Sequence, residues 1–317
     1  MSGKHPGPDL RAADPAGIAA AAALLRAGQP VALPTETVYG LAARADAADA
    51  VAAIYAAKGR PSFNPLIVHV ADTAQGEAIA QFDSRAQSLA AAFWPGALTL
   101  VLPLRCDARI APAVTAGLDT IALRCPAHPV MRAVLAETGL PLAAPSANRS
   151  GGVSPTSAQH VAASLAGKIA LVLDGGACAA GLESSIAALR SDGSWQLLRP
   201  GPITAAQIGQ VLGCAPDAIR EARIEAPGQL ASHYSPGKPV RLNADGGAQD
   251  EFLIGFGALN GAINLSPSGD LGQAAAQLYA CLHAAASAPQ PKVAVARIPD
   301  HGLGAAINDR LRRAAAA

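Results

Sequence analysis

The sequence predicts a two-domain α/β fold, because short apolar segments of strand length alternate with alanine-rich or amphipathic helical segments. The chain has 317 residues, of which 51% are hydrophobic and 15% are charged, so it is long enough and apolar enough to bury globular cores. The segment 226–239 is rich in proline and glycine, which is typical of a linker. We therefore expect a larger domain over 1–223, a linker over 224–239 and a small domain over 240–317.

The first helix and strand carry clear boundary signals. Asp14 followed by Pro15 is typical of a helix start, and Gly28 of a helix end, so we expect a helix over 15–27. Asp46 is expected to cap the next helix, over 47–57. Further strands are expected at 30–33, 66–70, 98–102, 120–124, 141–144, 169–173, 185–189 and 195–198, and further helices at 84–93, 129–138 and 204–212.

The small domain continues the same alternation. The segment Gly255 to Gly261 follows a strand, but its glycine spacing is one residue away from the dinucleotide-binding fingerprint, so we interpret it as a turn. Strands are expected at 240–242, 251–256, 262–265 and 293–296, and helices at 271–286 and 303–315.

Composition excludes several classes of function. The 24 basic and 23 acidic residues leave no overall field to attract nucleic acid or a membrane, so anion binding must come from local clusters. The five cysteines form no C-x-x-C pair, and their odd number suits a reducing cytoplasm. Residues 1–14 contain no apolar signal segment, and we expect no membrane span. The isolated histidines lack metal-ligand spacing, so we expect no metal cage of protein ligands.

Four basic residues at the ends of predicted elements indicate an anion site. Lys58 and Arg60 open the stretch 58–69, where glycine and prolines form a turn before a strand, and Arg124 and Arg199 end two other strands. Phosphate substrates require such cations at close range. Taken singly, each is as compatible with a structural role as with a ligand contact, whereas together they favour a site. Loop hydroxyls and amides that can serve the same site, or only cap their own turns, are Thr37, Thr120, Ser146, Ser154, Ser184, Ser185, Asn64 and Asn148.

Three ordered motifs carry a resemblance to a known family. They are Pro34 to Leu41 (PTETVYGL), Lys58 to His69 (KGRPSFNPLIVH) and Pro145 to Asn148 (PSAN). The chain resembles the YrdC-like family of threonylcarbamoyl-AMP synthases, closely over 16–234 and more loosely in the tail, where Gly302 to Leu311 is similar to the long form. The resemblance implies a twisted, open, mixed sheet with helices, followed by a smaller Rossmann-like domain.

Enzymes of this family condense L-threonine, bicarbonate or CO₂, and ATP into L-threonylcarbamoyl-AMP and pyrophosphate. The resemblance therefore implies a nucleotidyltransferase whose product feeds the threonylcarbamoyladenosine (t6A) modification of tRNA. Taken alone, His69 in its apolar strand is typical of a core histidine whose hydrogen bonds are made within the protein. The resemblance instead implies that it binds a ligand. By resemblance, the L-threonine pocket consists of Thr37, His69, Arg124, Ala144 through its backbone, and Ser184. By resemblance, ATP is held by Lys58, Arg60, Asn64, Thr120, Ser146, Ser154, Arg199 and Tyr234, with Lys58 and Arg60 also catalytic.

The resemblance extends to cofactor and partners. Mg²⁺ is expected to be held mainly by the ATP phosphates. The linker that carries Tyr234 is expected to fold over the nucleotide, and Arg124 is suited to pair with a carboxylate as a two-armed fork. Downstream t6A transferase proteins are the expected users of the adenylate. We expect at most weak binding of tRNA or double-stranded RNA.

Three alternatives remain open from the residues. An RNA-binding module without turnover would need a basic face, against which the near-zero net charge and the 3% aromatic content weigh. The carbamoyl-adenylate enzyme of hydrogenase maturation carries zinc-finger cysteine pairs that this sequence lacks. An unspecified α/β nucleotide binder is the least specific alternative.

Overall fold

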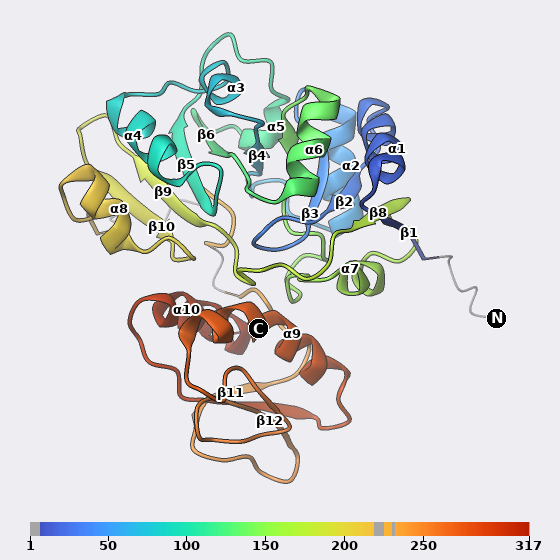
Figure 1. Ribbon diagram of the computed structural model, residues 1–317, viewed down its shortest axis with the longest axis vertical. Coiled ribbons are helices and arrows are strands. Elements are labelled where there is room, and N and C mark those ends of the chain that lie inside the picture. The colour runs from blue at the N-terminus through green and yellow to red at the C-terminus, as the bar shows by residue number, and fades with distance from the viewer. Residues whose placement is uncertain (1–6, 219–224, 230–231, 317) are drawn as a thin grey trace.

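The computed structural model describes residues 7–218, 225–229 and 232–316. In Figure 1 a large α/β domain, coloured blue to yellow, lies above a small one coloured orange to red. The predicted boundary between the first domain and the linker, at residues 223 and 224, lies outside the described residues, as do residues 230 and 231 of the predicted linker.

A mixed sheet forms the centre of the large domain. Within the described residues it has ten strands in the order β1-β8-β2-β3-β7-β4-β6-β5-β9-β10. Its neighbours pair in both senses, for example β4 with β6 in parallel and β5 with β6 antiparallel, which confirms an open mixed sheet. The strands are β1 (Asp9–Ala12), β2 (Val31–Leu33), β3 (Gly40–Arg44), β4 (Ile67–His69), β5 (Leu98–Pro103), β6 (Thr120–Arg124), β7 (Leu142–Ala143), β8 (Leu171–Asp174), β9 (Ser185–Leu189) and β10 (Trp195–Arg199).

Of the two helix caps predicted from the sequence, one is confirmed and one is wrong. Asp14 accepts a hydrogen bond from the Gly17 N–H at 2.8 Å, as expected for the first helix. The expectation for Asp46 is wrong: Ala47 occupies the cap position without a side-chain bond, because Asp46 pairs with Arg44 at 2.7 Å. The helices are α1 (Pro15–Arg26), α2 (Ala48–Lys58), α3 (Thr73–Glu77), α4 (Ser84–Phe93), α5 (Pro112–Thr115), α6 (Pro129–Thr138), α7 (Ala158–Ser164) and α8 (Ala205–Leu212).

Five of these elements were not predicted. The strand β3 consists mainly of small residues and contains no β-branched residue, so its sequence carries little strand signal although it is almost fully buried. The strand β1 is exposed along its whole length and pairs in parallel with β8. The helices α3, α5 and α7 span at most seven residues each, which is too short to show a helical period.

Successive strand residues pack on opposite faces of the sheet. Val68 belongs to the cluster that also contains residues of α2 and α4, whereas Leu142 belongs to the cluster with residues of α1 and α6. The second face continues through Ile67, Ala122 and Ile186, whose cluster contains no helical residue within the described part of the chain. This half of the second face is therefore left for the polar loops at the strand ends.

The small domain is a parallel sheet covered by two helices. Its strands lie in the order β11-β14-β12-β13, which confirms the Rossmann-like expectation. The turn expected after β12 is present, with Gly257 at a φ of 58°. The helices face the large domain (Figure 1), and the small-domain core includes Val38 and Leu182 of the large domain. The elements are β11 (Val240–Ala244), β12 (Glu251–Gly255), β13 (Ile263–Asn264), α9 (Leu271–Ser287), β14 (Lys292–Ala296) and α10 (Leu303–Ala315).

No helix in the described part of the chain is both long enough and apolar enough to cross a membrane.

Tyr39 provides a test of how the loop after β2 is anchored. Its buried hydroxyl donates to the Gly176 carbonyl at 2.8 Å and accepts from the Gly175 N–H at 3.2 Å. Tyr39→Phe leaves both partners without this bond, so we expect unfolding to become easier by about 1–3 kcal/mol in urea titrations. Ser88→Ala, which removes an exposed hydroxyl, is the control and should change stability by less than about 0.5 kcal/mol. Equal effects of the two substitutions would contradict the anchoring role.

Candidate active site

A pocket lies where several strands of the large sheet end. The last residues of β4, β6 and β10 and the segments that follow β2 and β7 line it, as expected for a ligand site at strand ends. Pro227, Gly228, His233 and Tyr234 line it as well. Ile67, whose apolar cluster contains no helical residue among those described, also lines it. The predicted residues that line the pocket are Thr37, Arg60, His69, Arg124, Ala144, Ser146, Ser184, Arg199 and Tyr234.

Lys58 and Arg60 are held by backbone carbonyl oxygens. Lys58 is the last residue of α2, and its ammonium donates to the carbonyls of Ser146 and Asn148 at 2.6 Å each. It is not among the residues that line the pocket and holds the loop after β7 instead. Arg60 donates to the carbonyls of Asn64 and Pro65, at 3.2 and 2.9 Å, within its own turn.

Arg199, a further cation of this pocket, has the same kind of environment. It donates to the Ser184 carbonyl at 3.0 Å, to the Ser184 hydroxyl at 3.1 Å and to the Pro227 carbonyl at 3.3 Å. Among the described residues, no carboxylate forms an ion pair with Lys58, Arg60 or Arg199. Burial lowers the pKa of all three, that of Arg60 to about 10. Buried cations without a protein counter-charge favour an anionic ligand.

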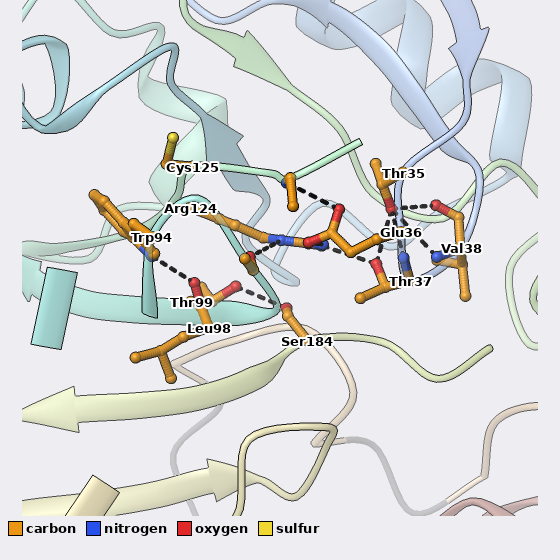
Figure 2. Close-up of polar contacts among 12 residues, drawn as sticks. Thr35, Glu36, Thr37, Val38, Trp94, Leu98, Thr99, Arg124, Cys125 and Ser184 are labelled. Atoms are coloured by element: carbon orange, nitrogen blue, oxygen red, sulfur yellow. Dashed lines mark hydrogen bonds and ion pairs between the residues drawn. The ribbon is translucent and has the colours of Figure 1, made fainter. Parts of the chain in front are cut away.

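Arg124 differs, because it already has a carboxylate partner (Figure 2). One terminal nitrogen meets a Glu36 oxygen at 2.6 Å and the other meets the Thr37 hydroxyl at 2.9 Å, while Nε donates to the Gly96 carbonyl at 3.1 Å. Burial acts to raise the pKa of Glu36, but the Arg124 charge and hydrogen bonds leave that pKa lowered. This side of the pocket is therefore close to electrically balanced.

Hydroxyl groups and a neutral imidazole complete this side. The Ser184 hydroxyl lies 2.7 Å from that of Thr99 (Figure 2). His69 is only 2% exposed, and its Nδ1 has no hydrogen-bond partner among the described residues, so it is not the satisfied core histidine that its strand alone would suggest. Burial and the Arg124 charge lower the pKa of His69 to about 3, which keeps the ring neutral.

Three other predicted ATP residues do not line the pocket. Asn64 is buried beside it, where its carbonyl accepts from Arg60. Thr120 begins β6, at the opposite end of the strand from Arg124 and therefore roughly 13 Å along it. Ser154 is fully buried, and its hydroxyl donates to a Glu183 oxygen at 2.6 Å. Their roles in ATP binding stay predictions.

The sequence did not reveal Glu183, a carboxylate in the pocket wall. Its second oxygen accepts from the Tyr279 hydroxyl at 2.7 Å and from Arg310 Nε at 3.0 Å, and both partners belong to the small domain. Burial acts to raise the pKa of Glu183, but nearby Arg310 and Arg199 and two hydroxyl donors lower it to about 2. The available signals were the position of Glu183 directly before Ser184 and that of Arg310 in the long-form segment.

The fold and the pocket define an α/β protein that binds anions at the strand ends of a mixed sheet. Residues 23–201 match the model of the Sua5, YciO and YrdC family, described as telomere recombination. Residues 203–316 match a model described as the threonylcarbamoyl-AMP synthase C-terminal domain. The chain belongs to this family of two-domain threonylcarbamoyl-AMP synthases.

Individual relatives span both domains. The chain is 42% identical to the threonylcarbamoyl-AMP synthase of Bacillus subtilis over 94% of its own length and 92% of the relative's. It is 44% identical to that of Pyrococcus abyssi over 69% of this chain and 66% of the relative. Among solved structures, P. abyssi Sua5 complexed with L-threonine matches with a TM-score of 0.85 and 34% identity, covering 94% of each chain.

The lowered pKa of Glu183 can be tested through the pH dependence of stability. Because the folded-state pKa of Glu183 is about 2 against an ordinary 4.5, its charge contributes stability that is present above pH 4.5 and lost as pH falls toward 2. Glu183→Gln removes this titration. We expect the difference in unfolding free energy between the native chain and this variant to be largest near pH 6 and to shrink toward pH 3. A constant difference in urea titrations across this range would contradict the lowered pKa.

Proposed function

We propose that the chain is an L-threonylcarbamoyladenylate synthase, a nucleotidyltransferase that converts L-threonine, bicarbonate or CO₂, and ATP into L-threonylcarbamoyl-AMP and pyrophosphate. The observation that carries the proposal is that a cationic wall, with Arg60 and Arg199, and an electrically balanced recess around Arg124 share one pocket, which Ser184 also lines. Family matches over both domains favour this function over the RNA-binding and hydrogenase-maturation alternatives.

The cationic wall supports the assignment of the ATP site. Arg60 and Arg199 have neutral partners only, so a triphosphate supplies the counter-charge that the protein does not. Lys58 holds the carbonyl of Ser146 and thereby shapes the loop that faces the nucleotide. Tyr234 lines the pocket, which supports its proposed role over the nucleotide.

The recess around Arg124 supports the assignment of the L-threonine site. A substrate carboxylate can approach the Arg124 guanidinium, which Glu36 holds in place, and the Thr37 and Ser184 hydroxyls lie at the same wall. The neutral His69 ring and Ala144 complete the recess. The relative solved as a complex with L-threonine supports a threonine site in this fold.

The proposed chemistry needs no covalent bond to the protein. The threonine amine attacks the carbon of CO₂ and loses a proton, which gives a carbamate. A carbamate oxygen then attacks the α-phosphorus, and the bond from that phosphorus to the bridging oxygen breaks to release pyrophosphate. The chain's own residues hold two anionic substrates together, exclude water from the labile carbamate and neutralise the leaving pyrophosphate through Arg60 and Arg199.

Mg²⁺ is proposed to enter with ATP. Within the described residues, no group of three or more His, Cys, Asp or Glu side chains is arranged to hold a metal, so the phosphates and water are its main ligands in this proposal. It supplies charge neutralisation on the triphosphate.

The remaining assignments concern the surroundings of the reaction. We propose that t6A transferase proteins consume the labile adenylate, and that direct binding of tRNA or double-stranded RNA is weak. We also propose a cytoplasmic location, which suits the five unpaired cysteines.

The decisive assay is pyrophosphate release from ATP with Mg²⁺ and bicarbonate, performed with L-threonine, without it and with L-serine in its place. We expect release that depends strictly on both threonine and bicarbonate, because the carbamate is the attacking group. Release in the absence of either substrate, or none under any condition, would overturn the proposed function.

Arg60→Ala tests the cationic wall. Removing this cation leaves one negative charge of the bound triphosphate without a partner. We therefore expect kcat/KM for ATP to fall by about 100-fold, comparable to the loss of one transition-state donor. Circular dichroism should show an unchanged fold. Arg297→Ala, at an exposed arginine of the small domain, is the matched control and should leave turnover unchanged. Normal pyrophosphate release by Arg60→Ala would remove Arg60 from the site.

A further inference from the structure

The pocket contains one buried carboxylate that the proposed chemistry does not use. Glu183 is 6% exposed and lies directly before Ser184, the residue that carries two of the hydrogen bonds made by Arg199. A negative charge at this position opposes the binding of a triphosphate, unless another cation neutralises it.

The small domain supplies that cation. Arg310 is completely buried, donates from Nε to Glu183 at 3.0 Å and from Nη1 to Asp309 at 2.8 Å, and lies over the Tyr234 ring at 5.6 Å from its centroid. Tyr279 donates to the same Glu183 oxygen at 2.7 Å. The helices α9 and α10, which carry these two residues, face the large domain (Figure 1).

The arrangement is not one that stability alone explains. Arg310 Nη2 is buried without a hydrogen-bond partner among the described residues, which costs stability. Apolar side chains of similar volume could join the two domains at least as well as a buried ion pair. A role in the pocket accounts for a buried charge at this position.

We propose that Arg310, assisted by Tyr279, is a positioning residue of the nucleotide site: it holds Glu183 as an ion pair, so that Arg199 stays available to the triphosphate. This inference rests on the proposed function and extends it by giving the small domain a direct part in nucleotide affinity. The structure supports it through the spatial order Arg310, Glu183, Ser184, Arg199, in which each residue contacts or directly precedes the next.

Removing Arg310 should release the charge of Glu183 toward Arg199. In Arg310→Met the carboxylate keeps its hydroxyl partners, Ser154 and Tyr279, but loses its counter-ion, and Arg199 is the other cation whose charge acts on it. We expect KM for ATP to rise at least about tenfold, which corresponds to roughly 1.4 kcal/mol. KM for L-threonine should rise by less than about threefold, because Arg124 keeps Glu36.

A double variant distinguishes the effect of the unpaired Glu183 charge from that of losing the ion pair between the domains. Glu183→Gln combined with Arg310→Met removes both charges, and we expect KM for ATP to return to within about threefold of the native value, although the domains have lost the same ion pair. Tyr279→Phe removes a neutral donor only and should raise KM for ATP by about two- to threefold. If the double variant binds ATP as poorly as Arg310→Met, the positioning role is overturned.

Lys238→Met is the matched control for lost stability. Its ammonium donates to the carbonyls of Ala285 and Ala288, at 2.8 and 2.5 Å, and does not contact Glu183. It should lower the melting temperature without changing KM for ATP. An equal rise of KM in Lys238→Met would show that any weakening of the small domain has this effect, and would overturn the inference.

Calorimetric titration with a non-hydrolysable ATP analogue keeps this test distinct from the proposed function. The analogue's Kd should follow the same order as KM, with Arg310→Met weakest and the double variant restored. If the Kd values follow this order but the native protein shows no threonine-dependent turnover, the proposed reaction is refuted and the inference stands. If turnover is normal but the Kd values are equal in all variants, the inference is refuted and the proposed reaction stands.

Discussion

Positive charge buried without a protein counter-charge is the constraint on which the pocket depends. Lys58, Arg60 and Arg199 each lose water on folding, and backbone carbonyls replace only part of its stabilisation. The local chain makes this possible: Gly59 ends α2 with a φ of 60°, and the turn after it brings carbonyl acceptors to Arg60. An anion that enters this wall gains the electrostatic energy that the protein leaves unsatisfied.

The opposite wall follows a different balance. Arg124 is paired with Glu36 and braced by Thr37, and burial keeps His69 neutral, so this recess carries little net charge. A zwitterionic amino acid fits such an environment better than a polyanion does. In the proposed assignment, the two walls separate the two substrates by electrostatics, and Ser184 lines the pocket that contains both walls.

The small domain contributes a charged group to the pocket wall, because its Arg310 forms an ion pair with Glu183. Its helices share an apolar core with Val38 and Leu182 of the large domain, which fixes their position. Arg310 then meets a carboxylate at the pocket wall that no cation of the large domain pairs with, among the described residues. Packing and charge act together here, because a buried ion pair contributes only when its geometry is held by its surroundings.

The sequence by itself determined much of the secondary structure and most of the chemistry. Local signals placed α4, α6, β6 and α10 at their observed bounds. Of the predicted cations, Arg60, Arg124 and Arg199 proved to line one pocket, and Lys58 is buried where it holds the loop after β7. Strand β3 was missed because its small residues become strand-like only between β2 and β7. Tertiary structure alone decided that Arg124 meets Glu36, 88 positions away, and that Arg310 meets Glu183, 127 positions away. Periodicity reports which side chains are buried, whereas the partner of a buried charge depends on which strands and helices become neighbours in space.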